Sequence, residues 1–252
     1  MMAKIYVFVN QKGGVGKTTS AVNIGTYFAL EGKRTLLVDF DPQGNLSSGL
    51  GVRKPAKTVY DLISEKASVE EVTYKTIVPN LHVIPASIDL SGAAVELADI
   101  ENREFFLKDR LAPVNDVYDY ILIDCPPSLG ILTINGLVCA SSVLVPLQCE
   151  YFALEGLSLL LETISRIQQH LNTELKLGGI FFTMYDSRTR LAQEVVQQVI
   201  AYFKDKVFKT IIPRNVKLSE APSHGLPISE YDAQSTGAKS YHKLALEILE
   251  NG

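Results

Sequence analysis

The first forty residues contain the feature that most limits the fold. Residues 4–10, KIYVFVN, form an apolar run with several β-branched side chains, which is typical of a buried strand. A glycine-rich stretch, NQKGGVGKTT, follows at residues 10–19, and apolar residues then recur at helical spacing from Lys17 to about Gly32. A second apolar run, RTLLVDFD, occupies residues 34–41. This strand–loop–helix–strand order predicts a βαβ unit and therefore a parallel sheet.

The same alternation continues to the end of the chain. Further strands are predicted at residues 81–86, 118–124, 142–148, 177–184 and 208–213, and helices at residues 155–171, 190–203 and 237–252. We therefore expect an α/β fold in which residues 1–252 form a single doubly wound domain, with a mostly parallel sheet flanked by helices. Ligands of such sheets bind beyond the carboxyl ends of the strands, where the polar residues of this sequence collect.

Composition narrows the class of protein. Hydrophobic residues make up 46% of the 252 residues and charged residues 21%, as in ordinary globular proteins. No apolar run approaches the roughly 18–20 residues that a membrane span needs. The three cysteines are odd in number and form no C-x-x-C pair, which favours buried reduced thiols. A net charge of −4 argues against binding of polyanions over the whole surface, but not against a local basic patch.

The glycine-rich stretch matches a phosphate-binding loop with one departure. Gly13, Gly14 and Gly16 allow backbone N–H groups to approach a phosphate closely. Lys17 is placed to reach the β- and γ-phosphates, and the Thr18 hydroxyl is placed to ligate Mg²⁺. The N-terminus of the following helix adds further N–H donors. The usual pattern G-x-x-x-x-G-K-[ST], however, would begin with glycine where this chain has Gln11, followed by a second lysine, Lys12.

Three carboxylates are predicted at the same edge of the sheet. The apolar strand YILID ends in Asp124, as a Walker B carboxylate does, and is expected to hold Mg²⁺ directly or through water. Asp39 and Asp41 lie two residues apart, so on an extended strand both would face the same way, and one could orient an attacking water molecule. The alternative is that each carboxylate only caps a turn at the end of its strand.

At this point the sequence resembles a known family. The segments KGGVGKTT, LLVDFDPQGN, DYILIDCPPSLG and IPRNVKLSEAPSHG are similar to those of the ParA/Soj partition ATPases, which belong to the deviant Walker A group of P-loop NTPases together with MinD and the nitrogenase iron protein. The resemblance extends from Lys4 to about Leu249, and QCEYFALEGL at residues 148–157 points to the Soj-like branch.

The resemblance implies a role for the extra lysine. In this family ATP is held between two chains, and Lys12 would reach the nucleotide of the partner and stabilise the transition state, much as an arginine finger does. Gly13 would lie where the two loops approach each other. Lys12, Lys17 and Asp41 would be the catalytic residues, with Asp41 positioning the hydrolytic water beside its structural neighbour Asp39.

The resemblance also assigns residues to the ligands. Mg²⁺ would be held by Thr18, Asp41 and Asp124. Pro213 and Asn215 match the turn that contacts adenine, and Met184 replaces the lysine of a guanine-reading motif, which favours adenine. The full set of residues expected to bind ATP is Lys12, Gly13, Gly14, Val15, Gly16, Lys17, Thr18, Thr19, Met184, Pro213 and Asn215.

A basic segment suggests nucleic acid as a partner. Residues 183–225 contain seven Lys and Arg residues against four Asp and Glu residues. Charge alone fits a solvated face equally well. By resemblance, Arg188 and Lys217 match positions that hold DNA phosphates, and Arg214 lies between them in the same segment. Such contacts would be independent of DNA sequence and sensitive to salt.

The function expected from these residues is that of an Mg²⁺-dependent ATPase. It would form a homodimer on binding ATP, bind double-stranded DNA non-specifically, and segregate chromosome or plasmid DNA with a ParB-like protein. We expect a cytoplasmic, nucleoid-associated protein that needs no membrane. The alternative is a MinD-like membrane-associated ATPase, but the last helix ends in acidic residues rather than in a basic amphipathic tail.

Overall fold

The computed structural model describes residues 2–97 and 100–251, and the part of the expected domain at residues 1, 98–99 and 252 lies outside the described residues. Its centre is a seven-stranded sheet with the strand order β3-β4-β2-β5-β1-β6-β7. All neighbouring strands are parallel except β3 and β4, which are antiparallel. The strands are β1 (Lys4–Phe8), β2 (Thr35–Asp39), β3 (Tyr74–Lys75), β4 (Leu81–Ile84), β5 (Tyr120–Asp124), β6 (Ser142–Gln148) and β7 (Lys176–Thr183).

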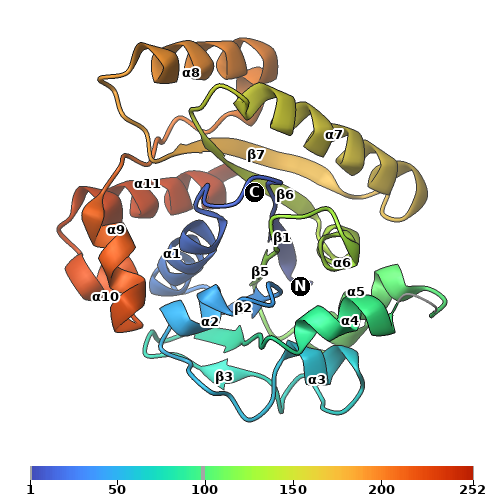
Figure 1. The fold of residues 1–252 in the computed structure, drawn as a ribbon. Helices are drawn as coiled ribbons and strands as arrows, with labels where there is room; N and C mark the ends of the chain where they lie inside the picture. Colours follow the sequence, from blue (N-terminus) through green and yellow to red (C-terminus); the bar gives the residue numbers. More distant parts are fainter. Residues whose placement is uncertain (1, 98–99, 252) are drawn as a thin grey trace.

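Helices cover both faces of this sheet (Figure 1). The α-helices are α1 (Lys17–Leu30), α2 (Asn45–Gly49), α3 (Val59–Ile63), α4 (Leu90–Glu96), α5 (Phe106–Leu111), α6 (Ile131–Cys139), α7 (Ala153–His170), α8 (Arg190–Phe203), α9 (Val216–Glu220), α10 (Ile228–Asp232) and α11 (Thr236–Asn251). Short 3₁₀ turns are Arg103–Phe105, Ala112–Val114, Lys204–Lys206 and Ala221–His224. The predicted doubly wound α/β fold is thereby confirmed.

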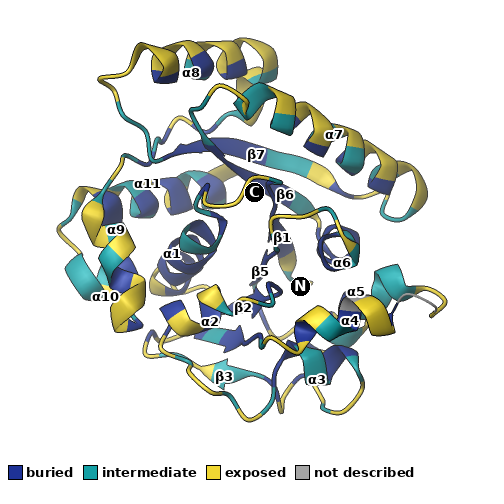
Figure 2. Cartoon of the chain, in the orientation of Figure 1, coloured by how far each residue is buried: buried dark blue, intermediate teal, exposed yellow. Residues whose placement is uncertain are grey.

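The alternation of side chains along β1 divides the core into two layers. Ile5 and Val7 point to the face that is covered by α3, α5, α6, α7 and α8, whereas Tyr6 and Phe8 point to the face covered by α1, α10 and α11. Because both faces are covered, β2 and β5 are buried throughout and β1 is buried after Lys4, while α7 and α8 expose their outer sides (Figure 2). Within the described residues, no helix is long and apolar enough to cross a bilayer.

One predicted strand is absent. Residues 208–213 run beside β7, and the N–H groups of Phe208 and Ile212 donate to Ile180 and Phe182 at 2.8 and 2.9 Å. The N–H groups of Lys209 and Thr210, however, donate to the carboxylate of Glu247 on α11. Residues 207–213 therefore form only two isolated bridges, Ile180 with Val207 and Tyr185 with Pro213, and the prediction of a strand at residues 208–213 was wrong. The two-residue strand β3 was not predicted because so short a segment carries no periodic signal.

Two glycines on helices, Gly136 and Gly156, differ in how closely other atoms pack against them. A Cβ atom on Gly136 of α6 would lie 2.6 Å from Cys125 Sγ and 3.1 Å from Val7 Cγ2, whereas one on Gly156 of α7 would meet no atom within 4 Å. We expect Gly136→Ala to lower the free energy of unfolding by about 1–3 kcal/mol. Gly156→Ala should raise it by about 0.5–1 kcal/mol, because alanine restricts the unfolded chain. Urea unfolding measures the free energy of unfolding of both variants. If both substitutions changed it by the same amount, the close packing at Gly136 would be contradicted.

Candidate functional site

The loop between β1 and α1 has a backbone suited to binding an anion. Gly14 and Gly16 have φ angles of 74° and 88°, in the left-handed region that side chains with a Cβ rarely adopt. Gly16 is the N-cap of α1, so the first N–H groups of this helix point towards the loop that precedes it. Gly13 differs, since its φ is not positive and the nearest atom to an added Cβ is Pro127 Cβ at 4.0 Å. Among the described residues, no backbone conformation or close contact therefore requires glycine at position 13.

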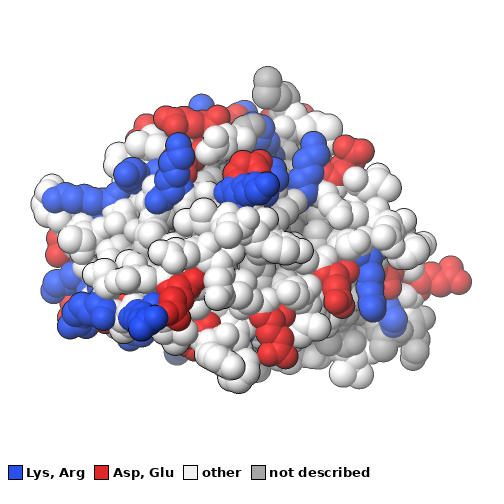
Figure 3. Space-filling model, turned by 90° about the horizontal axis from the view of Figure 1, so that it is seen from above, with Lys and Arg blue, Asp and Glu red and all other residues white. Residues whose placement is uncertain are grey.

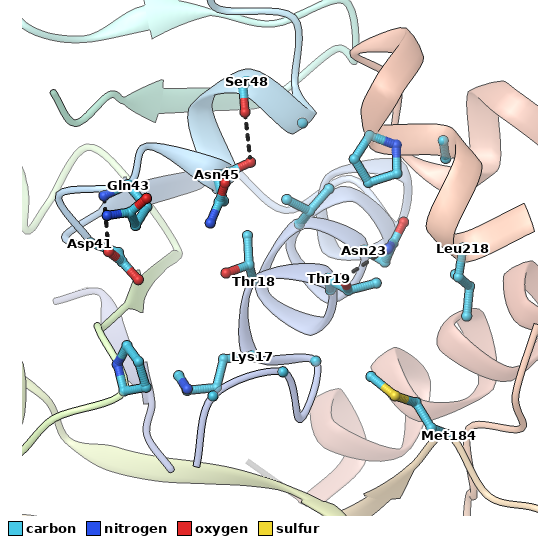
Figure 4. Close-up of a pocket in the computed structure, with 18 of the residues that line it drawn as sticks. Lys17, Thr18, Thr19, Asn23, Asp41, Gln43, Asn45, Ser48, Met184 and Leu218 are labelled. Atoms are coloured by element: carbon cyan, nitrogen blue, oxygen red, sulfur yellow. Dashed lines mark hydrogen bonds between the residues drawn. The ribbon is translucent and has the colours of Figure 1, made fainter. Parts of the chain in front are cut away.

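A cavity of about 460 Å³ lies beside this loop. Figure 4 shows Lys17, Thr18 and Asp41 around the same open space, with Asn45 and Ser48 of α2 on one side and Met184 and Leu218 on another. The remaining lining residues are Gly13, Gly14, Gly16, Thr19, Val22, Asn23, Gln43, Gly49, Pro127, Ala221, Pro222 and Leu226.

Lys17 is the buried cation of this cavity. Its side chain is only 6% exposed, and its Nζ donates to the carbonyl oxygens of Asn10 and Lys12 at 3.1 and 3.2 Å. Burial lowers the pKa of Lys17, and the nearby carboxylates of Asp124 and Asp41 oppose that shift. Since carbonyl oxygens are weaker partners for an ammonium group than phosphate oxygens are, the site favours an anionic ligand that displaces them.

Asp124 lies behind the loop and is fully buried. The Thr18 hydroxyl donates to Asp124 Oδ2 at 2.6 Å, whereas Asp124 Oδ1 is buried without a hydrogen-bond partner. Burial, followed by the charge of Asp39 on the neighbouring strand, raises the pKa of Asp124 well above its ordinary value. A buried carboxylate oxygen without a partner, next to a hydroxyl, fits a hard cation such as Mg²⁺. Among the described residues, no cluster of three or more His, Cys, Asp or Glu side chains could hold a metal by itself.

The two aspartates of the 39–41 segment differ in their hydrogen-bond partners and in whether they line the cavity. Asp39 is completely buried, and its Oδ2 accepts hydrogen bonds from the Ser47 backbone N–H at 2.8 Å and the Ser47 hydroxyl at 2.5 Å. Asp41 lines the cavity instead, with its Oδ1 accepting from the Gln43 N–H at 3.0 Å. Because β2 ends at Asp39, the extended strand that the sequence suggested does not continue to Asp41.

A second cavity of about 310 Å³ adjoins the first and shares Gly16, Thr19, Met184, Leu218 and Pro222 with it. It is lined by Pro213 and Asn215, the residues expected to form the base-contacting turn, and also by Arg214 and Tyr241. Met184 has a φ angle of 49°, and its Cε lies 3.7 Å from the position of a Cβ on Gly16. The two cavities together could hold a polyphosphate at one end and a flat base at the other.

Two of the residues predicted to bind ATP, Val15 and Lys12, line neither cavity. Val15 is buried, and its carbonyl oxygen accepts from the Thr183 hydroxyl at 2.7 Å, which ties the loop to the end of β7. Lys12 lines neither cavity, and its ammonium group forms an ion pair with Glu150, just after β6.

A backbone contact brings the segment that carries Arg188 next to the segment that carries Arg214 and Lys217. The Arg214 N–H donates to the Tyr185 carbonyl at 3.1 Å, which brings residues 185–188 beside the start of α9. Arg188 pairs with Asp186 at 2.7 Å, and Lys217 pairs with Glu220 at 2.9 Å. The Arg188 guanidinium group lowers the pKa of Asp186, and Arg214 contributes to the same shift. On the face seen in Figure 3, groups of Lys and Arg likewise alternate with Asp and Glu instead of forming a continuous basic belt.

Some residues of the site were not predicted. Asn10 donates to the Pro146 carbonyl at 2.8 Å and accepts from the Lys12 N–H at 3.0 Å, which fixes the start of the loop. Asn23 of α1 lines the cavity and accepts from the Ile228 N–H at 2.9 Å. An asparagine at the end of an apolar strand was the only available signal for Asn10, whereas the partners of Asn23 and Ser47 are distant in sequence.

Comparisons with known proteins agree with this geometry. A family model described as an AAA domain matches residues 3–177. The chain is 70% identical to the chromosome-partitioning ATPase Soj of Treponema pallidum, over 98% of both chains. It is 55% identical to the sporulation initiation inhibitor protein Soj of Bacillus subtilis, over 100% of both chains. A crystal structure of cobyrinic acid a,c-diamide synthase from Mycobacterium smegmatis with bound ADP and magnesium is similar, with a TM-score of 0.87 and 38% identity over 99% of this chain and 95% of that one.

The contact between Ser47 and Asp39 yields a test with a defined pH dependence. Burial raises the pKa of Asp39 to about 6, so ionisation of Asp39 opposes folding, and this penalty grows as pH rises from about 4 through 6. The Ser47 hydroxyl stabilises the ionised form and also accepts from the Ala86 N–H at 3.1 Å. We therefore expect Ser47→Ala to lower the free energy of unfolding by about 1–3 kcal/mol, and by more at pH 8 than at pH 5.

Urea unfolding at both pH values measures this difference. Ser48→Ala is the matched control, because the Ser48 hydroxyl donates only to the exposed Asn45 carbonyl at 3.2 Å. If Ser47→Ala lowered the free energy of unfolding equally at pH 5 and pH 8, Ser47 would not stabilise an ionised Asp39.

Proposed function

Because the chain belongs to the ParA/Soj family of chromosome-partitioning ATPases, we propose that it is an ATP-driven switch that pairs with a second copy of itself. In the proposed cycle, the Mg²⁺·ATP form dimerises and binds double-stranded DNA without sequence preference. A ParB-like protein then stimulates hydrolysis and releases the DNA. The cycle would take place in the cytoplasm on the nucleoid. The observation that carries the proposal is that Lys12 lies outside the cavity lined by its own loop, with its ammonium group directed to Glu150.

The cavity suits ATP binding by the residues that surround it. The β- and γ-phosphates would replace the Asn10 and Lys12 carbonyls at Lys17 Nζ, while the loop N–H groups cradle the chain of phosphates. Adenine would lie in the adjoining cavity against Met184, Pro213 and Asn215. The ADP and magnesium held by the similar Mycobacterium smegmatis protein support this assignment.

Thr18 and Asp124 would hold the magnesium ion. Asp124 Oδ1 offers a buried oxygen without a partner, and a cation there would offset the effect of burial on the carboxylate. Bound Mg²⁺ would supply charge neutralisation to the phosphates. Asp41, on the wall of the cavity, would orient the attacking water, while Asp39 fixes α2 through Ser47.

Hydrolysis would be completed by a second chain. In each pocket the partner's copy of Lys12 would lie against the phosphates and stabilise the charge that develops in the transition state. Gly13 supports this arrangement, because no contact with the described residues of its own chain requires glycine there. Two chains held together would also carry two copies of the basic segment around Arg188, Arg214 and Lys217, which links DNA affinity to the nucleotide state.

Substitution of Lys12 tests whether the lysine acts on a second chain. We expect Lys12→Ala to abolish the dimer formed with Mg²⁺·ATP while changing ADP affinity by less than about twofold, because the residue is absent from the ADP pocket of its own chain. Light scattering and titration with ADP measure the two effects. Asp41→Ala is the comparison variant, since it should still dimerise but hydrolyse ATP slowly. An ATP-bound dimer of normal affinity in Lys12→Ala would refute the proposal.

Substitution of Lys217 tests the DNA surface. Lys217→Ala should weaken binding of the ATP-bound dimer to random duplex DNA without changing dimerisation. The slope of log affinity against log salt should fall by about 1 for each DNA phosphate that Lys217 no longer neutralises. Lys75→Ala is the control, because Lys75 is exposed on β3 at the opposite edge of the sheet. If DNA affinity and its salt slope stay unchanged in Lys217→Ala, Lys217 does not bind DNA.

A further inference from the structure

The ion pair between Lys12 and Glu150 is not explained by nucleotide binding within one chain. The Lys12 ammonium group donates to Glu150 Oε2, and the side chains are 50% and 43% exposed. A lysine at the start of a phosphate loop would be expected to remain available to phosphate. Here its charge is instead neutralised by a carboxylate of the same chain.

The fold holds both partners of the pair firmly in place. Lys12 follows β1, and its N–H is bound by Asn10, whose side chain is buried and tied to Pro146 in the neighbouring strand β6. Glu150 follows the end of β6, and its own N–H donates to the Gln148 carbonyl at 2.9 Å while its carbonyl accepts from the Ala153 N–H at 3.0 Å. Because β1 and β6 are parallel neighbours, their carboxyl ends present Lys12 and Glu150 to each other at the same edge of the sheet.

Exposed aromatic residues follow Glu150 in the sequence. Tyr151 and Phe152 come directly after Glu150 and are 77% and 68% exposed, with their rings in contact edge to face at 5.0 Å between centroids. Two adjacent exposed aromatic side chains are unusual on a surface that only water covers. Their place directly after Glu150 fits burial by the second chain of the proposed dimer.

A second chain would change the balance between Lys12 and Glu150. The triphosphate of the partner carries several negative charges and forms stronger bonds to an ammonium group than one exposed carboxylate does. When Lys12 turns to that triphosphate, Glu150 loses its partner and its charge lies near the phosphates. The pair therefore opposes dimerisation, and only a ligand of higher negative charge can overcome it.

We propose that Glu150 is a positioning residue that holds Lys12 in the single chain and releases it only to the triphosphate of a second chain. The inference rests on the proposed function, because it assumes that Lys12 acts across the dimer. Glu150 then sets the protein concentration at which ATP produces the dimer. It acts through Lys12 and need not touch the nucleotide.

The experiment measures the dimer dissociation constant with Mg²⁺ and a non-hydrolysable ATP analogue, by sedimentation velocity over a range of protein concentrations. An exposed ion pair shifts an equilibrium by about 1.4- to 5-fold, and a dimer contains two such pairs. We therefore expect Glu150→Gln to lower the dissociation constant by about 2- to 30-fold. Glu150→Asp keeps the charge, so its dissociation constant should lie between that of the unmodified chain and that of Glu150→Gln.

Three measurements separate this role from a general effect on the fold. Glu162→Gln removes the same charge from an exposed position further along α7 and should leave the dissociation constant unchanged. ADP affinity and the thermal unfolding temperature of Glu150→Gln should match those of the unmodified chain, because the pair is half-exposed and outside the cavity. A kcat that is unchanged in the fully assembled dimer, together with a lower protein concentration for half-maximal activity, would support a positioning role.

The outcomes distinguish this inference from the proposal on which it rests. If the unmodified chain dimerises with the analogue but Glu150→Gln has the same or a higher dissociation constant, the positioning role is refuted and the proposed function stands. If the unmodified chain does not dimerise at any concentration tested, the proposed function fails and this inference fails with it.

Discussion

The parallel pairing of β5 between β1 and β2 is the constraint on which the rest of the site depends. In the register of these strands Asp124 lies opposite Phe8 on one side and Asp39 on the other. The three strands therefore end at one level, and the loops that follow them leave the sheet at the same edge. The phosphate loop, the turn that carries Asp41 and the segment around Pro127 meet there and enclose the cavity. Hydrogen bonding between buried backbones thus places residues more than a hundred positions apart within reach of one ligand.

Burial gives different properties to residues of the same type at this edge. Lys17 is buried with only carbonyl partners, whereas Lys12, five residues earlier, is half-exposed and paired with a carboxylate. Among the aspartates, Asp39 accepts two hydrogen bonds from Ser47, while one oxygen of Asp124 has no hydrogen-bond partner among the described residues. Because moving a charge out of water is costly, each buried charged group retains a capacity to be stabilised by a suitable ligand.

The exposed cations that the resemblance connects with phosphate follow a common pattern. Lys12, Arg188 and Lys217 each pair with a carboxylate of the same chain, namely Glu150, Asp186 and Glu220. Exposed pairs of this kind contribute only about 0–1 kcal/mol, so a phosphate group can displace the carboxylate at small cost. In the ligand-free chain the pairs reduce the net attraction for polyanions, in keeping with the negative charge of the whole protein. Such a surface favours ligands that present several phosphates at once.

The amino-acid sequence by itself determined the parallel α/β fold, the phosphate loop and the strand that ends in Asp124, because these depend on local periodicity and on glycine spacing. It also determined the helix at 190–203, whose bounds agree with α8. The sequence could not exclude a strand at 208–213, since the carboxylate that occupies two of its N–H groups comes from Glu247, far along the chain. Only the tertiary structure decided that Asp39 bonds Ser47 while Asp41 faces the cavity, and that Lys12 meets Glu150. Those outcomes depend on where a strand stops and on which distant side chain lies beside it, and neither is encoded in the local pattern of residues.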